Sequence, residues 1–303
     1  MLTKLVLAIR ERYHPLFHLR KLRLFRQATK FLDRPIAIHF DGINHPVYVS
    51  LSKNLSWVLS NGRAGEEAER TNFLNIVGIG SFKTLWDVGA NVGLYGFLFA
   101  SAVKDGSVLM FEPDQANTRL IKATIARSSL KSVGLIEAAV SDVTGNINFQ
   151  LDEVTGATGT LNAADSSFIV RHHDTMPTTV TVSCVTLDGI ANDVSLPPDF
   201  IKIDVEGAEL RVFWGADATI KRYSPAIFFE CDTDQGVIRT HLLGRGYHLF
   251  DFETMKESES VPHNCLALHG THHAKIIEAV RKSACQSNST EYGSRAEKLG
   301  KTH

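Results

Sequence analysis

The pattern of apolar and polar positions changes character near residue 82. From there on, short continuous apolar runs alternate with longer segments of helical pattern. Strands of a parallel sheet read as continuous apolar runs because helices cover both faces of the sheet. The apolar runs predict strands at 84–90, 107–113, 135–142, 199–207 and 226–231. The helical patterns lie at 94–102, 115–128, 208–215 and 235–243. This alternation predicts an α/β fold with a doubly wound, mostly parallel sheet.

Further elements are expected on either side of this core. Residues 247–253 and 264–270 are two apolar runs without a helix-length segment between them, which predicts an antiparallel hairpin at the edge of the sheet. Before the core, 36–51 reads as two short strands around a turn, and 55–80 reads as a helix. The expected organisation is therefore an N-terminal segment 1–35, a cap 36–80, a main domain 81–281 and a tail 282–303.

Two segments are polar instead. Residues 150–178 are rich in Gly, Thr, Ser and Asp, which predicts a long loop or lid, and long loops in compact domains often carry function. The tail from Lys282 is polar and low in aromatic residues, so we expect it to be disordered.

The N-terminal segment is strongly basic. Residues 1–35 hold nine Lys and Arg against two acidic residues, a net charge of +7, which leaves −8 on the rest of the chain. Leu2, Leu5, Val6 and Ile9 form a helical stripe. We favour a helix packed on the domain with its basic face in solvent. The alternative is peripheral contact with an anionic membrane surface.

Composition narrows the class of protein. The 303 residues are 44% apolar and 21% charged, with a net charge of −1, which excludes wholesale disorder and a polycationic nucleic-acid binder. The four cysteines have no CxxC spacing, so neither a zinc ribbon nor a disulfide framework is indicated. No apolar run approaches the roughly 20 residues of a membrane span, and no signal peptide is evident. We expect a cytoplasmic protein.

A glycine-containing loop at 86–93 (WDVGANVG) lies between a predicted strand and a predicted helix. Its spacing is GxxxG, because Asn91 stands where a dinucleotide-binding loop has its second glycine. Asp87, two residues before Gly89, suits a cationic ligand better than a pyrophosphate. Glu112 ends the next strand, where an acidic residue can accept both hydroxyls of a ribose. The pair predicts a nucleoside with a charged amino-acid arm, which is S-adenosylmethionine; the alternative is a tight turn and a solvated Glu.

Several motifs carry a resemblance to a known family. They are DVGANVGLYG (87–96), FEPD (111–114), AAVSDVTG (138–145), TLD (186–188), FIKIDVEGAEL (200–210) and IFFE (227–230). Together the stretch from about 46 to 270 resembles the FkbM family of S-adenosylmethionine-dependent methyltransferases. The resemblance implies a Rossmann-like class I methyltransferase fold and O-methylation of hydroxyls on sugars or secondary metabolites.

The resemblance also assigns cofactor-binding residues. It implies a loop on the methionine side of the cofactor made of Asp87, Gly89, Ala90, Asn91 and Gly93. It places Glu112 at the ribose, and Ser141 and Asp142 beside the adenine.

The chemistry needs a proton acceptor or a metal, because a hydroxyl is a poor nucleophile until its proton leaves. Asp204 and Glu206 end the fourth predicted parallel strand and Glu230 ends the fifth, so the three carboxylates should converge beside the cofactor. Asp204 is the preferred base and Glu230 the second. Glu206 could instead hydrogen-bond the turn at Gly207, and Lys202 could neutralise one carboxylate. The same oxygens could hold Mg²⁺.

Two histidine pairs, His172–His173 and His272–His273, do not make natural bidentate metal sites, because adjacent strand residues face opposite ways. The leading hypothesis is an O-methyltransferase acting on a hydroxyl of a glycan or small molecule. One alternative is a nicotinamide-dependent oxidoreductase, against which Asn91 and the GxxxG spacing argue. Another is a catalytically silent S-adenosylmethionine-binding module recruited to a membrane, against which the intact acidic residues count.

Overall fold

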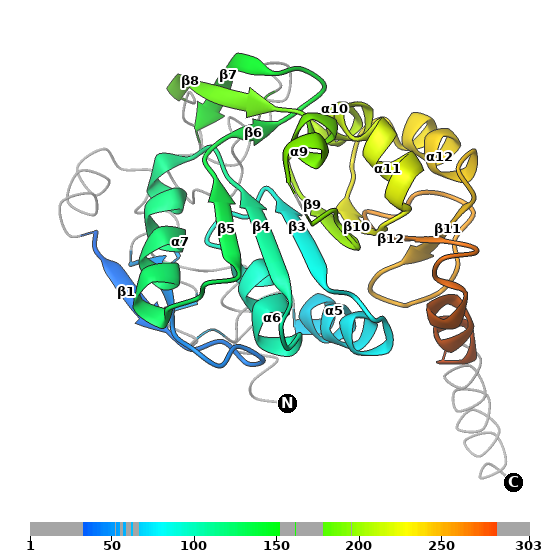
Figure 1. Ribbon diagram of the computed structural model, residues 1–303, viewed down its shortest axis with the longest axis horizontal. Coiled ribbons are helices and arrows are strands. Elements are labelled where there is room, and N and C mark those ends of the chain that lie inside the picture. Colours follow the sequence, from blue (N-terminus) through cyan, green and yellow to red (C-terminus); the bar gives the residue numbers. More distant parts are fainter. Residues whose placement is uncertain are drawn as a thin grey trace, which may run out of the picture.

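The computed structural model describes residues 33–51, 53–54, 57–58, 62, 67–151, 161, 178–194 and 196–283 (Figure 1). Within these residues the largest sheet has seven strands in the order β11-β12-β10-β9-β3-β4-β5. The strands are β3 (Thr84–Val88), β4 (Ser107–Phe111), β5 (Val133–Ile136), β9 (Phe200–Ile203), β10 (Ala226–Glu230), β11 (Tyr247–Asp251) and β12 (Asn264–His269). Every residue of β3 and of β9 is buried, which explains why these strands read as unbroken apolar runs.

The sheet has the predicted doubly wound topology. Strands β5, β4, β3, β9 and β10 pair in parallel, while β12 is antiparallel to both β10 and β11. The α/β class, the mostly parallel sheet and the antiparallel hairpin at its edge are therefore confirmed. The strand order reverses between β3 and β9, and in open α/β sheets ligands bind at such a switch point, beyond the carboxyl ends of the strands.

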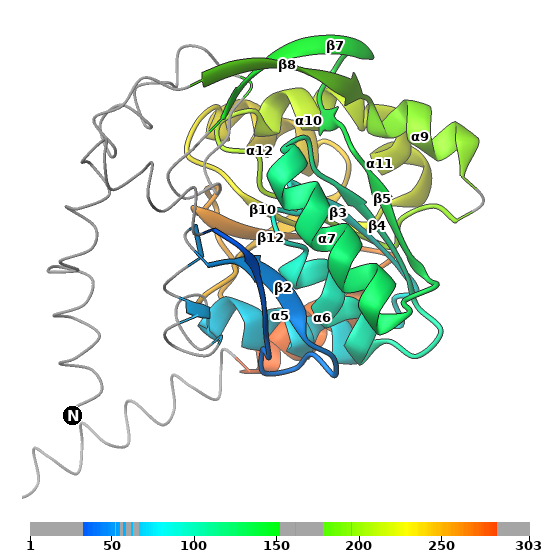
Figure 2. The ribbon, with the colours of Figure 1, turned by 90° about the vertical axis from the view of Figure 1, so that its left-hand side faces the viewer.

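Helices cover both faces of the sheet (Figures 1 and 2). One face carries α5 (Glu67–Ile79), α6 (Leu94–Ala102), α7 (Gln115–Ser128) and a C-terminal helix at 274–283, packed in one apolar cluster. The other face carries α9 (Leu187–Asp193), α10 (Glu209–Gly215), α11 (Asp217–Tyr223) and α12 (Gln235–Leu243), packed in a second cluster. The bounds of α6, α7 and α12 equal those predicted, whereas α9 and α11 were not predicted.

One predicted strand, 135–142, is wrong as a single element. The chain turns after β5, where the Ala138 N–H donates to the Ile136 carbonyl, and continues as β6 (Ala139–Val140) in another sheet. This sheet has the order β6-β8-β7, with β7 (Gly145–Leu151) and β8 (Thr178–Val185) antiparallel. The predicted loop 150–178 therefore begins and ends in strand. Its interior, apart from residue 161, lies outside the described residues.

The cap contains the predicted short hairpin, β1 (Pro35–Ile38) with β2 (Val47–Ser50). It packs on α7, where the Tyr48 N–H donates to Thr124 Oγ1 at 3.0 Å (Figure 2). The predicted continuous helix 55–80 is wrong, because Gly62 is a turn residue with φ of +77° and α5 begins only at Glu67.

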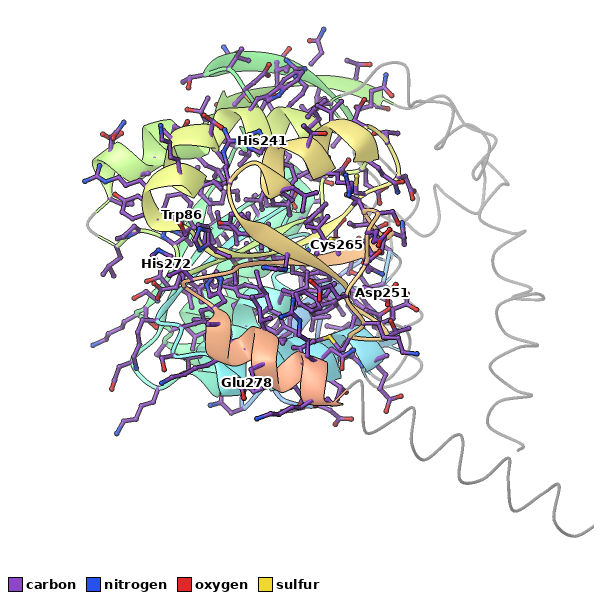
Figure 3. The ribbon with its side chains drawn as sticks, turned by 90° about the vertical axis from the view of Figure 1, so that its right-hand side faces the viewer. Trp86, His241, Asp251, Cys265, His272 and Glu278 are labelled. Atoms are coloured by element: carbon purple, nitrogen blue, oxygen red, sulfur yellow. The ribbon has the colours of Figure 1, made fainter. Side chains whose placement is uncertain are left out.

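The ends of the chain limit what can be said of the predicted domains. Residues 1–32, which hold most of the basic segment, and 284–303 lie outside the described residues. The C-terminal helix, which carries Glu278 (Figure 3), continues to Ser283, so the first two residues of the predicted tail lie in it. Among the described residues, no helix is long and apolar enough to cross a membrane.

Candidate active site

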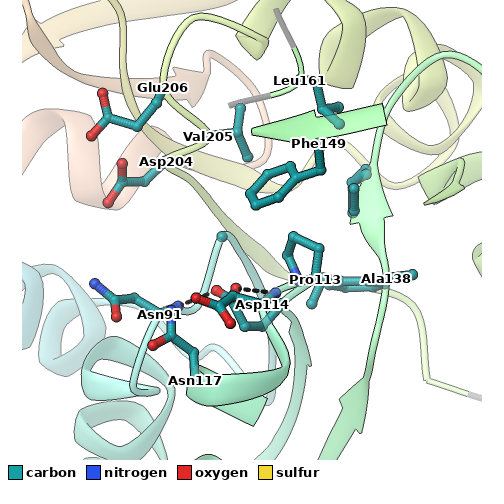
Figure 4. Close-up of a pocket in the computed structure, with 15 residues that line it drawn as sticks. Asn91, Pro113, Asp114, Asn117, Ala138, Phe149, Leu161, Asp204, Val205 and Glu206 are labelled. Atoms are coloured by element: carbon teal, nitrogen blue, oxygen red, sulfur yellow. Dashed lines mark hydrogen bonds between the residues drawn. The ribbon is translucent and has the colours of Figure 1, made fainter. Parts of the chain in front are cut away.

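A pocket of about 640 Å³, open mouth included, lies at the switch point (Figure 4). Its glycine-loop side is formed by Gly89, Asn91, Phe111, Glu112, Pro113, Asp114 and Asn117. Its carboxylate side is formed by Asp204, Val205 and Glu206, and the remaining wall by Ala138, Ala139, Val140, Phe149 and Leu161.

The glycine loop is pinned between two strands by its backbone. The N–H groups of Gly89 and Ala90 both donate to the Phe111 carbonyl at the end of β4, each at 3.0 Å. Gly89 has φ of +74°, and a Cβ there would lie 1.8 Å from the Asp204 carbonyl oxygen. Asn91 also has a left-handed backbone, with φ of +54°. Only glycine fits at position 89, and the close approach joins the two sides of the pocket.

Asp87 lies in β3, the strand that leads into this loop, and supports the loop from there. It is fully buried, and its Oδ2 accepts the Gly96 N–H in the first turn of α6 at 3.0 Å. Burial raises the pKa of its carboxyl, although Lys202, whose Nζ lies 3.8 Å from Oδ1, opposes the rise. Asp87, Ala90 and Gly93 are not among the described residues that line the pocket. Their predicted contact with a cofactor stays a prediction.

Glu112 is the buried carboxylate of the glycine-loop side. Its side chain is only 5% exposed, yet Oε2 accepts the Asn91 N–H at 2.7 Å and Oε1 accepts the Asp114 N–H at 2.8 Å (Figure 4). Burial raises the pKa of Glu112 to about 8, although both hydrogen bonds act in the opposite direction. The two backbone donors hold this carboxyl in one orientation at the pocket wall.

Ser141 and Asp142 lie next to the pocket wall and do not line it. The Ser141 hydroxyl is fully buried and donates to Asp142 Oδ1 at 2.9 Å, and the Arg211 Nε donates to the same oxygen at 2.9 Å. These contacts tie the end of β6 to α10. The adenine contacts expected of Ser141 and Asp142 stay a prediction. Phe149, which lines the pocket, was not predicted because β7 itself was not predicted.

Lys202 connects the two sides. Register pairs it with Asp87 on β3, and its ammonium donates to Asp204 Oδ2 at 3.0 Å. It also lies 5.0 Å from the centre of the Tyr95 ring, a cation–π contact. This buried ammonium therefore interacts with one carboxylate from each side of the pocket, Asp87 and Asp204.

The carboxylate side holds more acids than predicted. Burial raises the pKa of Glu206 to about 8, with Asp204 and Glu230 adding to the rise. Burial likewise raises the pKa of Glu230 to about 7, with Asp204 adding to it. Glu209, which was not predicted, has its pKa raised by burial to about 7. Its Oε1 accepts the Gly207 N–H at 2.9 Å, so Glu209 makes the turn contact that was considered for Glu206.

His263 was also missed. Its Nε2 lies 3.2 Å from Glu230 Oε1, and its Nδ1 lies 2.7 Å from Asp232 Oδ1. The signal for it is the edge hairpin: β10 pairs with β12 so that Glu230 faces Asn264, which brings His263 beside the strand end. Nothing in local spacing indicates a contact across more than 30 residues.

The predicted Mg²⁺ receives no support. Among the described residues, no group of three or more His, Cys, Asp or Glu side chains is arranged to hold a metal ion. His273 is buried and its Nδ1 accepts the His269 N–H at 2.9 Å, a structural role. His172 and His173 lie outside the described residues.

A family model described as the Methyltransferase FkbM domain matches residues 87–257, which include both sides of the pocket. The chain belongs to the FkbM methyltransferase family. The sequence-based resemblance to that family is confirmed, and the protein is a methyltransferase.

Solved structures similar to this FkbM chain are distant. Methyltransferase FkbM from Methylobacillus flagellatus KT has 18% identity and a TM-score of 0.43, over 62% of this chain and 43% of that chain. Precorrin-6y C5,15-methyltransferase from Geobacter metallireducens GS-15 has 13% identity and a TM-score of 0.37, over 65% and 84%. An O-methyltransferase from Bacillus cereus in complex with SAH has 16% identity and a TM-score of 0.34, over 63% and 67%. No curated protein matches the chain.

Proposed function

We propose that the protein binds S-adenosylmethionine in the switch-point pocket and transfers its methyl group to a hydroxyl of a sugar, glycan or small metabolite. The observation that carries this proposal is the position of Glu112. A buried carboxyl, held by two backbone N–H groups beside a glycine loop, stands inside the segment that matches the FkbM methyltransferase family.

The residues present fit such a cofactor. Gly89 lines the pocket with backbone atoms alone, and Glu112 offers a carboxyl to a ribose. Glu112, Asp114, Asp204 and Glu206 line the pocket and Asp87 is buried behind its glycine loop, and this set of acids favours a ligand that carries positive charge. When bound, S-adenosylmethionine would supply an activated methyl group on a sulfonium.

The chain itself must orient the acceptor and take its proton. Glu230 is our proposed base, because its pKa of about 7 suits proton transfer near neutral pH. Asp204, the base preferred from sequence, lines the pocket and receives the Lys202 ammonium, so we propose that it orients the acceptor hydroxyl. Carboxyls of raised pKa gather on this side, as expected for a site that deprotonates an alcohol. Their presence supports oxygen as the methylated atom.

The test combines cofactor binding with transfer. Calorimetry should detect binding of S-adenosylmethionine, and labelled methyl groups should then pass into glycans or metabolites of a cell extract. Label that survives mild alkali would indicate an ether, as O-methylation of a hydroxyl requires, whereas a methyl ester would be hydrolysed. Binding without transfer to any acceptor would favour a silent module, and no binding would contradict the proposal outright.

A further inference from the structure

Three side chains form a hydrogen-bonded chain beside the carboxylate side of the pocket. Glu230 ends β10, Asp232 follows two residues later, and His263 precedes β12. The imidazole bridges the two carboxylates, with Nε2 at 3.2 Å from Glu230 and Nδ1 at 2.7 Å from Asp232. When both ring nitrogens carry protons, the ring donates to both partners at once.

The charges around His263 favour the protonated form of its imidazole ring. Partial burial alone would lower the pKa of His263, but Glu230 and Asp232, with Glu253 adding to them, raise it above its ordinary value. Glu230 in turn faces the negative charges of Asp204 and Asp232 and the positive charges of Lys202 and His263. The imidazolium is therefore one of two cations that offset the crowding of acids at Glu230.

We propose that His263 is a positioning residue for the methyl transfer, which holds the Glu230 carboxylate ionised and in one orientation ready to accept the acceptor's proton. This inference rests on the function proposed above. As the oxygen–carbon bond forms, the hydroxyl proton passes to Glu230. The carbon–sulfur bond breaks and its electron pair stays on sulfur. The sulfonium thereby loses its positive charge, which is balanced by the proton now on Glu230. Glu230, which is partly exposed, then releases the proton to water.

The arrangement differs from other ion pairs of the chain. His248 and Glu257 also form a histidine–carboxylate pair, with Nδ1 at 2.8 Å from Oε1, and Arg281 joins them. The charges that act on Glu257 are those of Arg281 and His248, whereas Glu230 is affected by Asp204, which lines the switch-point pocket. Since this pair has similar chemistry at a different place, His248→Gln is a matched control for His263→Gln.

The first test needs no turnover. In the full-length protein, NMR titration of the histidine Cε1–H signals should give His263 a pKa above that of an exposed histidine, with the signal assigned by its loss in His263→Gln. In Glu230→Gln this pKa should fall, because the ring loses a charged partner. A His263 pKa that does not change in Glu230→Gln would overturn the proposal.

The second test is the pH profile of turnover. In His263→Gln, the acidic limb of kcat should move to higher pH, because Glu230 is protonated more readily without the cation, and kcat at pH 7 should fall roughly tenfold or more. The KM for S-adenosylmethionine should stay unchanged. His263→Arg, which keeps the charge, should move the limb back, and His248→Gln should match the wild type.

The outcomes separate the two proposals. Transfer by the wild type with an unmoved profile in His263→Gln, or no recovery in His263→Arg, would overturn the role of His263 and leave the proposed function standing. A wild type that transfers no methyl group would overturn the proposed function itself, and the role of His263 with it.

Discussion

The two sides of the pocket are built in different ways. On the glycine-loop side, backbone groups make the decisive contacts: Gly89 and Ala90 bond the Phe111 carbonyl, and Asn91 bonds Glu112. On the carboxylate side, the decisive contacts join side chains, from Lys202 to Asp204 and from His263 to Glu230. The backbone contacts of the glycine-loop side suit a cofactor, which is the same in every reaction. The side chains of the carboxylate side can be adapted to a particular acceptor and to proton transfer.

The acids of the carboxylate side also affect the stability of the fold. Charged groups crowd the carboxylate side, and the raised pKa values of Glu206, Glu209 and Glu230 report that their ionisation is unfavourable there. Active sites commonly keep such groups at the expense of stability. We therefore expect substitutions on the two sides to separate binding from turnover.

The largest effect should come from the carboxylate side. Glu230→Gln removes the proposed base and should lower kcat by about 10²–10⁴-fold. Affinity for S-adenosylmethionine should remain within a few-fold of the wild type, as calorimetry would show. Asp204→Ala should also keep cofactor binding and lose turnover.

These two variants separate the candidate bases. If Asp204→Ala keeps wild-type turnover, Asp204 has no part in the mechanism. If Glu230→Gln keeps it, Glu230 is not the base. Glu257→Gln, in the ion pair with His248 and Arg281, is the control and should leave kcat unchanged.

Gly89→Ala should give the next largest effect, on stability and on binding together. The new Cβ would collide with the Asp204 carbonyl oxygen in a backbone conformation that L-residues rarely adopt. We expect a loss of about 3 kcal/mol of unfolding free energy, measured by denaturant titration, from left-handed strain and overpacking combined.

Gly78→Ala is the matched control for this substitution. Gly78 lies in α5, and apart from neighbouring residues of its own helix nothing lies within 4 Å of an added Cβ, so alanine there should be neutral or slightly stabilising. Equal stability of both variants would mean that the loop is not held against β9 as described.

A smaller effect should follow Glu112→Gln. The amide nitrogen would face one of two backbone donors that now bond carboxyl oxygens, and the carboxyl partner for the ribose would be lost. We expect S-adenosylmethionine to bind about 10–100-fold more weakly, with kcat nearly kept at saturating cofactor. Glu137→Gln, an exposed carboxylate paired with Lys122, should leave the affinity unchanged.

A separate prediction concerns the stability of the wild type against pH. Glu112 and Glu206 have folded-state pKa values of about 8, raised from 4.5, so the folded state binds more protons than the unfolded state between these values. Stability from these groups is present below pH 4.5 and is lost as pH rises through 8. Tm should therefore fall between pH 5 and 8, by roughly 2–4 °C for each kcal/mol lost. Glu112→Gln should flatten that slope; an equal slope would argue against its burial in solution.

Much of the glycine-loop side could be predicted from sequence, because its signals are local. The bounds of α7 follow from apolar periodicity and from Asp114, whose side chain accepts the Ala116 N–H at its start. A glycine at position 89 predicts a left-handed backbone turn, and Glu112 is the residue directly after the end of β4. Strand ends also correctly placed Asp204 and Glu230 at one edge of the sheet.

The remaining features depend on contacts that no local pattern encodes. Strand β8 alternates exposed and half-buried residues, and β6 has only two residues, so neither reads as part of a buried parallel sheet. His263 meets Glu230 only through the register of β10 with β12. The role of Glu209 at Gly207 depends on the conformation of a turn in which Glu206 has φ of +50°.

The most direct test of the account is calorimetric titration of S-adenosylmethionine into the wild type, Glu112→Gln and Glu230→Gln under one condition. The account predicts clear binding by the wild type, about 10–100-fold weaker binding by Glu112→Gln, and nearly wild-type affinity in Glu230→Gln. Wild-type affinity in Glu112→Gln, or no binding by the wild type, would contradict it.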